Sequence, residues 1–330
     1  MTKKISWGVL STAKIGTEKV IPAMQNGKYS QISAIASRDI AKAQKTAETL
    51  GIPKAYGSYE ALLKDREIEA IYIPLPNHLH VEWTVKSLEA GKHILCEKPI
   101  GLNFEQAEYL RKKIPKFPEL KIMEAFMYRF HPQWQTVKQL IHNRTIGDLK
   151  NIHSHFSYYN VDPSNIRNKL EFGGGGLLDI GCYCVSLSRF LFENEPLRVC
   201  ASIEYDPKMK IDRFVSAIME FENGTSTFTC STQLADHKYA EISGTYGRIE
   251  IENPFVLLPE SKTKIIHNVG PERQEIIFEA CNQYTIQGDM FSQAILTCSN
   301  VPTPINDAFA NMKVIDKIFE SSRRETWVEI

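Results

Sequence analysis

Hydrophobic positions along the first 125 residues follow two different periods. Short continuous apolar runs, such as "IEAIYIPLP" at 68–76, fit strands that are covered on both faces. Between them lie segments with an apolar residue every three or four positions, as on one face of a helix. Strands alternating with helices indicate βαβ units and a parallel sheet. Strands are expected at 4–10, 31–37, 68–76, 93–96 and 121–125, and helices at 14–25, 39–51, 58–65, 79–91 and from 104.

The pattern changes after residue 125. A helix at 132–143 leads into strands with apolar residues at every second position, separated by turn residues such as Asn223-Gly224. A glycine run precedes a helix within 173–192, and a last helix covers 305–322. This order predicts a mostly antiparallel sheet. Its strands are expected at 151–160, 197–205, 213–221, 225–234, 238–243, 247–252 and, more weakly, up to about 280.

Length and composition narrow the class of protein. The chain has 330 residues, and one core rarely organises more than about 250 to 300, so two domains are expected. With 43% apolar residues, 24% charged residues and a formal net charge of zero, neither nucleic acid nor an acidic membrane surface is expected as the main partner. No apolar run approaches the roughly 20 residues of a membrane span. The start "MTKKISWGVL" lacks the features of a signal peptide, which predicts a cytoplasmic protein.

The seven cysteines are scattered through apolar segments, which indicates reduced thiols. A zinc site from Cys182, Cys184, His153 and His155 is conceivable, and a zinc hydrolase is the most distant alternative. The spacing does not match a zinc ribbon, and residues two apart on a helix do not face each other. No metal is therefore expected.

The turn after the first strand, "GVLSTAKIG", is a candidate phosphate-binding turn. A dinucleotide site needs a tight turn there, so that amides at a helix N-terminus approach the pyrophosphate. Gly8 is present, while the small residues Ser11 and Ala13 occupy the later glycine positions. An ordinary strand-to-helix turn is the alternative. Its place after the first strand of a βαβ array favours the dinucleotide.

The end of the second strand indicates which dinucleotide is bound. NAD sites usually place an acid there for the ribose hydroxyls, and NADP sites place an arginine near the 2′-phosphate. This strand ends in Ala36-Ser37-Arg38, where Ser37 can donate to a phosphate and Arg38 can clamp it. A solvated arginine before a helix capped by Asp39 is the alternative. We therefore expect NADP rather than NAD.

These patterns predict two domains. Residues 1–125 should form an α/β domain with a Rossmann-type parallel sheet that binds NADP. Residues 126–330 should form an α+β domain with a mostly antiparallel open sheet, the expected substrate-binding domain. The helix at 305–322 is a candidate to pack back toward the first domain.

Two polar clusters are candidates for chemistry. Ligands of open parallel sheets bind outside the carboxyl ends of the strands, where "PLPNHLH" and "CEKP" are expected. Lys98 would there be a cation beside a hydride donor. In "EFGGGGLLDIGCYCVS", Asp179 and Tyr183 are four residues apart and share a helix face. The alternative for this second cluster is a capped amphipathic core helix.

The motifs "CEKP", "PNHLH", "MEAFMYRFHP", "NIRNKLEFGGGGLLDIGCY" and "EISGTYGRIEI" resemble those of the glucose–fructose oxidoreductase/inositol dehydrogenase/rhizopine catabolism (Gfo/Idh/MocA) family. The resemblance covers nearly the whole chain, in the same order. Within the family, "EAFMYRFHPQ" and Tyr183 are most similar to NADP-dependent sugar dehydrogenases and dimeric dihydrodiol dehydrogenases.

The resemblance implies roles for individual residues. Lys98 would contact the substrate hydroxyl and the nicotinamide ribose, Tyr183 would be the general acid/base, and Asp179 would orient substrate or acid. The Lys98–Pro99 bond is expected to be cis. Ser11 departs from the glycine of the family at the first turn. Further cofactor contacts are implied for Gly8, Ser11, Thr12, Ala13 and Ile15 on the pyrophosphate and adenosine side, for Leu75, Asn77, His80 and Glu97 on the nicotinamide side, and for Arg167 and Tyr284.

The sequence thus predicts an NADP-dependent oxidoreductase that transfers a hydride to or from a sugar or related polyol. An ammonium about 4 Å from a tyrosine is worth about 4 kcal/mol at an effective dielectric of about 20, so Lys98 could bring Tyr183 toward ionisation at neutral pH. The alternatives are a trans-dihydrodiol dehydrogenase and, in another class, a non-catalytic NADP-binding sensor. The family resemblance also implies a homodimer or homotetramer formed through the antiparallel sheet.

Overall fold

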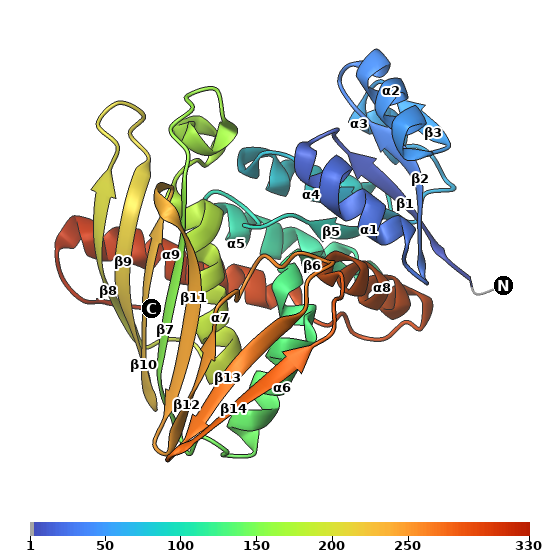
Figure 1. The fold of residues 1–330 in the computed structure, drawn as a ribbon. Coiled ribbons are helices and arrows are strands. Elements are labelled where there is room, and N and C mark those ends of the chain that lie inside the picture. Colours follow the sequence, from blue (N-terminus) through green and yellow to red (C-terminus); the bar gives the residue numbers. More distant parts are fainter. Residues whose placement is uncertain (1–2) are drawn as a thin grey trace. The chain divides into compact units, whose positions relative to one another are not determined.

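The computed structural model describes residues 3–330, which divide into two compact units (Figure 1). The first unit comprises the segment that ends at Met127 together with Asn282–Phe309. The second comprises Tyr128–Cys281 and Ala310–Ile330. Each unit is built around its own sheet.

The first unit contains a six-stranded, wholly parallel sheet in the order β3-β2-β1-β4-β5-β6, which confirms the predicted Rossmann-type fold. The first three strands are added outward in one direction from β1, and the next three in the opposite direction from β4. Folds of this kind bind ligands at this switch point between β1 and β4. Strand β3 was not predicted, because its three half-buried residues form no apolar run. The strands are β1 (Ile5–Leu10), β2 (Ser30–Ala36), β3 (Lys54–Tyr56), β4 (Ala70–Ile73), β5 (His93–Cys96) and β6 (Ile122–Glu124).

Local sequence explains the ends of several helices in this unit. The Asp39 carboxylate accepts from the amides of Ala41 and Lys42, and Gly51 ends the same helix with a φ of 64°. The first helix is wide, with a π-helical stretch η1 (Ile15–Val20) just before Pro22, which has no N–H for the helical ladder. The other helices are α1 (Ile21–Gln25), α2 (Ile40–Leu50), α3 (Tyr59–Leu63), α4 (His80–Glu89) and α5 (Phe104–Lys113).

Helix α8 (Gln283–Leu296) was not predicted, and it belongs to the first unit. Ser292 accepts a hydrogen bond from the indole of Trp7 at 3.0 Å, and Asp289 accepts from the amides of Lys28 and Tyr29. Because polar residues such as Ser292 are buried in α8, its sequence shows no clear apolar stripe. The compact units therefore differ from the predicted 1–125 and 126–330 division in the placement of 282–309.

The second unit contains a nine-stranded sheet in the order β14-β13-β12-β11-β7-β10-β9-β8-β15. All neighbours are antiparallel except β7 and β10, which confirms the predicted mostly antiparallel sheet. The strands are β7 (Leu149–Tyr159), β8 (Arg198–Tyr205), β9 (Asp212–Phe221), β10 (Gly224–Ser231), β11 (Gln233–Gly244), β12 (Gly247–Ile251), β13 (Thr263–Val269), β14 (Glu272–Phe278) and β15 (Val328–Glu329).

Alternation along β7 separates the two faces of this sheet. Ile152, Ser154 and Phe156 are buried on one face, while His153 points to the other face and is exposed. Helix α7 (Cys182–Phe192) packs on the buried face against β7 and β10, and α6 (Pro132–His142) contacts β13 (Figure 1). The remaining long helix is α9 (Ile305–Arg324).

The segment Leu170–Phe192 is long and apolar enough to cross a membrane by length and composition. Within the structure, 83% of its apolar stretch is buried. This burial is typical of the core helix of a soluble protein.

Candidate active site

The turn after β1 forces a serine into a backbone region that favours glycine. Ser11 has a φ of 112°, and its amide donates to the carbonyl of Ala36 at the end of β2. The Ser11 hydroxyl accepts from the Ala13 amide at 2.9 Å, which stabilises the unusual turn. Thr12, Ala13 and Ile15 follow as half-buried residues at the start of the first helix. A helix N-terminus therefore lies at the carboxyl end of β1, as a phosphate site requires.

Gly8 has a different position from these turn residues. It lies within β1 and is buried, and a Cβ on it would come within 2.6 Å of a Leu62 methyl and 3.0 Å of an Ile71 methyl. The structure thus gives Gly8 a packing function between β1 and its neighbours. A direct contact of Gly8 with a cofactor stays a prediction.

The end of β2 presents one buried hydroxyl and one exposed cation. The Ser37 hydroxyl accepts from the amide of Asp39 at 3.2 Å. Arg38 is exposed, and it hydrogen-bonds the hydroxyl of Tyr59. Burial raises the pKa of Tyr59, and the Arg38 charge opposes this shift. Arg38 therefore extends along the surface beside the carboxyl end of β2.

His80 connects the loops that follow β4 and β5. The ring is fully buried, with Nε2 2.7 Å from the Leu75 carbonyl oxygen and Nδ1 2.7 Å from the Pro99 carbonyl oxygen. Burial lowers the pKa of His80 to about 4, against the two carbonyls, which favour the charged ring. Because both nitrogens face backbone oxygens, His80 orders these loops. A cofactor contact of its own stays a prediction.

The loop after β5 is held from a second side. The Glu124 carboxylate at the end of β6 accepts from the Ile100 amide at 2.7 Å and is buried. The Lys98–Pro99 peptide bond is cis, which confirms that expectation. Sequence analysis missed Glu124, although an acid at the end of the apolar segment "KIMEA" was a detectable feature. Lys98 therefore follows a strand whose exit loop is fixed by His80 and Glu124.

Glu97 and Tyr284 come together in the first unit. The Tyr72 hydroxyl, on the fully buried β4, donates to the Glu97 carboxylate at 2.6 Å. Burial raises the pKa of Tyr284, and the charge of Glu97 acts in the same direction. Glu97 follows β5 and Tyr284 lies in α8, so two residues far apart in sequence share one polar cluster, while their contact with a cofactor stays a prediction. Leu75 is buried and Asn77 is half-exposed after β4.

In the second unit, Asp179 is the centre of a hydrogen-bonded cluster. The Tyr158 hydroxyl donates to one carboxylate oxygen at 2.5 Å, and Arg167 Nε donates to the other at 3.1 Å. Burial and the charge of Asp179 raise the pKa of Tyr158. The sequence analysis missed Tyr158, whose position on the buried face of β7, two residues after Phe156, was its only indication. The structure shows Arg167 bound to Asp179, and the expected contact of Arg167 with a cofactor stays a prediction.

Tyr183 lies one helical turn beyond Asp179 and is only 5% exposed. Its ring packs against Tyr128, Phe156 and Phe255, with ring centroids 5.5 to 5.8 Å apart. The charge of Asp179 is the main cause that raises the pKa of Arg167, and Tyr183 acts in the same direction. Asp179 and Tyr183 therefore lie near the same guanidinium, that of Arg167, and the Tyr183 ring packs against three other aromatic rings.

The helix that carries both residues is irregular. It starts with a π-helical turn η7 (Leu177–Gly181) and continues as α7. A Cβ on Gly181 would come within 2.8 Å of both Cys230 Sγ and a Leu177 methyl. The glycine inside this helix thus permits close packing on β10. Such π-helical turns are frequent at functional sites.

The candidate zinc ligands do not gather. Cys182 and Cys184 are buried on the helix side of the sheet, where Cys184 neighbours Ser154 of β7. His153 is exposed on the other side of the same strand. Among residues 3–330 there is no group of three or more His, Cys, Asp or Glu residues that could hold a metal.

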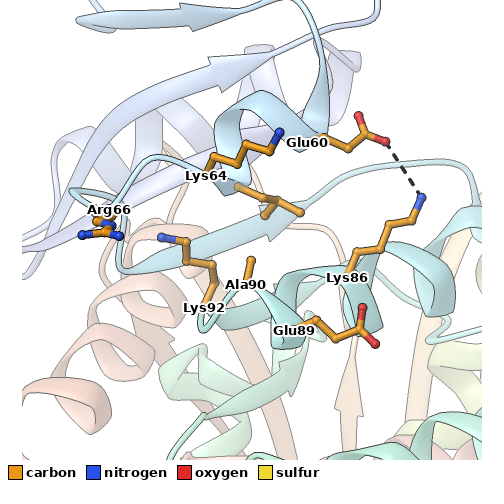
Figure 2. A pocket seen from close by; sticks show the side chains of 8 residues that line it. Glu60, Lys64, Arg66, Lys86, Glu89, Ala90 and Lys92 are labelled. Carbon is orange, nitrogen blue, oxygen red and sulfur yellow. Dashed lines mark ion pairs between the residues drawn. The ribbon is translucent and has the colours of Figure 1, made fainter.

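One hollow lies away from these clusters. It has a volume of about 520 Å³ and opens on the surface of the first unit, with a Lys86–Glu60 ion pair at 4.0 Å on its rim (Figure 2). Lys92 donates to the carbonyls of Asp65 and Ile68, just before β4. The hollow is therefore at the amino ends of β4 and β5, opposite to the edge where such folds bind ligands. Its lining residues are Glu60, Leu63, Lys64, Arg66, Lys86, Glu89, Ala90 and Lys92.

Comparison with known proteins identifies both halves of the chain. Residues 5–117 match the profile of an oxidoreductase family with an NAD-binding Rossmann fold, and residues 134–250 match the GFO/IDH/MocA C-terminal domain. The chain is 39% identical to an oxidoreductase of Rhizobium meliloti, over 98% of both chains. It is 34% identical to the D-xylose 1-dehydrogenase (NADP(+)) 2 of Haloferax volcanii, over 98% of this chain and 99% of that protein.

Two further similarities point the same way. A trans-1,2-dihydrobenzene-1,2-diol dehydrogenase of Xenopus tropicalis is 36% identical, over 81% of this chain and 80% of that protein. Among solved structures, a 3-ketoreductase from Actinomadura kijaniata in complex with NADP and TDP-benzene superposes with a TM-score of 0.90. It is 26% identical in sequence and is matched over 97% of this chain and 98% of that one.

Proposed function

Since the chain belongs to the Gfo/Idh/MocA oxidoreductase family, we propose that it transfers a hydride between NADP and a hydroxyl-bearing carbon of a sugar or related polyol. The observation that carries the proposal is the cluster of Tyr183, Asp179 and Arg167 in the second unit. It combines a proton donor, a carboxylate and a cation in a largely buried setting. The chain is an oxidoreductase with an NAD-binding fold, and this cluster is the part of the second unit suited to proton transfer.

The donors of the first unit fit a phosphate-bearing dinucleotide. Ser11 and Thr12 directly precede the first helix, and Arg38 provides a cation at the end of β2. Neither of the two residues that directly follow β2, Ser37 and Arg38, is the acid typical of NAD sites. Two relatives carry NADP in their names, the xylose dehydrogenase and the ketoreductase complex. These observations support NADP as the cofactor.

When bound, NADP supplies the nicotinamide ring that accepts or donates the hydride. Tyr183 takes the proton of the substrate hydroxyl in oxidation and returns it in reduction. A free tyrosine has a pKa near 10 and is a weak base at neutral pH, so nearby positive charge is required. Arg167 provides part of it, and Lys98 is proposed to provide the rest at the hydroxyl. Solved structures of the ketoreductase include variants in which a tyrosine is replaced by phenylalanine or a lysine by alanine.

Asp179 orients the reacting hydroxyl in this proposal. Its two carboxylate oxygens already accept from Tyr158 and Arg167, which fixes the plane of the carboxylate. A carboxylate so held can accept one further hydrogen bond from a sugar hydroxyl. The proposal therefore gives Asp179 a binding function and leaves proton transfer to Tyr183.

The second candidate is a trans-dihydrodiol dehydrogenase, favoured by the 36% identical relative. Both candidates use the same proton-transfer group and differ in the substrate that they bind. A non-catalytic NADP-binding sensor has no need for Lys98, Asp179 and Tyr183 together, and all three are present. The enzyme is therefore the better proposal.

A substrate panel tests the function. Purified protein is offered NADP with aldoses, inositols and trans-dihydrodiols, or NADPH with ketosugars, while absorbance of NADPH is followed. Tyr183→Phe should reduce kcat by about a hundredfold or more, the usual contribution of general acid–base catalysis. Lys98→Met should reduce kcat at saturating substrate. Full activity of Tyr183→Phe would rule out the proposed mechanism.

The sheet of the second unit supports a homo-oligomer as a further proposal. His153, Thr227 and Ile218 lie side by side on the face opposite to α7, and Ile218 is 41% exposed. An open sheet face of this kind suits a second copy of the chain in a dimer or tetramer. Light scattering at micromolar concentration should give at least twice the mass of one chain. We also expect the enzyme to be located in the cytoplasm.

A further inference from the structure

A buried carboxylate lies beneath the helix that carries Asp179 and Tyr183. Asp212, the first residue of β9, is 3% exposed. Its Oδ2 accepts from the Leu177 amide at 2.6 Å, and the Gly176 amide also donates to the carboxylate. Leu177 is the first residue of the π-helical turn that contains Asp179. Asp212 therefore caps this helix from a neighbouring strand rather than from within the helix.

The glycine run makes this cap possible. Gly175 has a φ of 124°, and a Cβ on it would lie 1.9 Å from Asp212 Oδ1. On its other side the Gly175 amide donates to the Arg167 carbonyl at 2.9 Å. The segment before the helix is thus held between the Asp212 carboxylate and the backbone of Arg167. Arg167 in turn donates to Asp179 through its side chain.

Burial and neighbouring groups determine the ionisation of Asp212. Burial raises the pKa of Asp212 to about 7, backbone amides oppose the shift, and the charge of Asp179 adds to it. The ionisable groups that respond to its charge from neighbouring strands are Tyr205 of β8 and Cys230 of β10. The amide groups at the helix N-terminus supply the positive potential that an ionised Asp212 needs.

We infer that Asp212 is a positioning residue for the reaction: its ionised carboxylate, accepting from the amides of Leu177 and Gly176, fixes the start of the helix that presents Asp179 and Tyr183. The inference rests on the proposed function of these two residues. On protonation, one oxygen becomes a donor and can no longer accept from the helix amides. The helix start then loosens, and kcat falls as the pH decreases through about 7.

An ionised carboxylate in a buried site lowers the stability of the fold. Because the folded-state pKa is raised, the free energy of unfolding should decrease as the pH rises from about 4 to about 7. A residue with a merely structural function would be expected to stabilise the protein at its working pH. Stability and activity should therefore respond in opposite directions when the charge of Asp212 is removed.

The test is Asp212→Asn in the full-length enzyme, because asparagine has the same shape and keeps one acceptor. At pH 8 its melting temperature should equal or exceed that of the wild type, while kcat falls about tenfold, as expected for a lost hydrogen bond to a charged acceptor. The acid limb of the kcat profile near pH 7 should disappear. Asp206→Asn is the matched control, because Asp206 is also buried but accepts from Lys208, Met209 and Gln233 instead of the helix.

Amide hydrogen exchange of residues 173–181 separates this inference from the proposed function. In the wild type, protection of this segment should decrease below pH 7 after correction for the intrinsic rate, and in Asp212→Asn it should be low at all pH values. If Tyr183→Phe is fully active but this exchange pattern is found, the proposed proton transfer by Tyr183 is wrong, while the result still supports that Asp212 fixes the start of the helix. A wild-type kcat profile in Asp212→Asn, or a loss of stability and activity together with the acid limb retained, would overturn the inference.

Discussion

Ser11 shows how a single residue can depart from a family pattern and keep the local geometry. A non-glycine residue at a φ of 112° is strained by about 1 to 3 kcal/mol. The Ser11 hydroxyl offsets part of this by accepting from the Ala13 amide. The glycine conformation is therefore retained without glycine, and the amide of Ala13 is occupied by a side chain.

At the residue scale, we expect Arg38 to determine the preference for NADP over NAD. Arg38→Ala removes the exposed cation at the end of β2, where the 2′-phosphate is expected. The KM for NADP should increase by tenfold or more, since a hydrogen-bonded charge pair contributes about 1.5 to 3 kcal/mol, while the KM for NAD changes little. Steady-state kinetics with both cofactors measures this.

Lys42→Ala is the control for a general loss of positive charge. Lys42 is exposed in the first turn of α2, the helix that follows Arg38. Equal increases of the two Michaelis constants in Arg38→Ala would remove the assignment of NADP to this residue.

At the scale of a whole element, contacts from several parts of the second unit hold the helix formed by Leu177–Gly181 and α7. Its N-terminus is capped by Asp212, its interior glycine meets β10, and its aromatic residue packs against Phe156 and Phe255. Each contact comes from a different strand or loop of the second unit. The orientation of Asp179 and Tyr183 therefore depends on the sheet as much as on the helix.

Gly181→Ala tests the packing of this element. The new methyl group would lie 2.8 Å from Cys230 Sγ and from a Leu177 methyl, so the helix must shift away from β10. We expect a loss of about 1 to 3 kcal/mol in the free energy of unfolding, as for overpacked cores, together with reduced kcat. Urea denaturation and steady-state kinetics measure the two effects.

Gly16→Ala is the matched control, because its Cβ would meet nothing closer than 3.5 Å within another helical segment. If Gly181→Ala is as stable as this control, the close contact with β10 does not constrain the helix.

At the scale of the whole molecule, the two units differ in their buried ionisable groups. The first unit contains His80, with a pKa lowered by burial to about 4. The second contains His131, lowered by burial to about 4, and Asp212, raised to about 7. A lowered histidine pKa destabilises the fold as the pH falls from about 6.5 to about 4, and a raised aspartate pKa has the opposite sign.

The first unit should therefore lose stability in acid before the second. For His80 alone, the change from its ordinary pKa of 6.5 to about 4 corresponds to about 3 kcal/mol between pH 6.5 and pH 4. In the second unit the two effects partly cancel. Amide hydrogen exchange between pH 7 and pH 4, corrected for intrinsic rates, should show protection falling earlier in β4 and β5 than in β9 and β10.

His80→Gln should flatten this pH dependence in the first unit, because glutamine does not titrate. His142→Gln, at an exposed histidine of the second unit, should leave the acid sensitivity of β4 and β5 unchanged. An unchanged slope in His80→Gln would show that other groups cause the acid sensitivity.

Local sequence determined the elements with strong periodicity and clear ends. The parallel strands other than β3, the helix between Asp39 and Gly51, and the mostly antiparallel second sheet were predicted, because burial and capping leave a pattern at short range. Residues next to strand ends, such as Ser11, Arg38 and Lys98, could be chosen as candidates, since the carboxyl edge of a parallel sheet collects ligand contacts.

The tertiary structure alone decided which distant residues share a cluster. Tyr158 on Asp179, Tyr284 beside Glu97, Glu124 on the loop after β5 and Asp212 beneath the helix start are contacts between segments separated by about 20 residues or more. Such polar contacts leave no period in the sequence, because each needs only one side chain at one position. Sequence periodicity therefore determined the framework and the edge where the chemistry is expected, while long-range packing decided the partners that orient it.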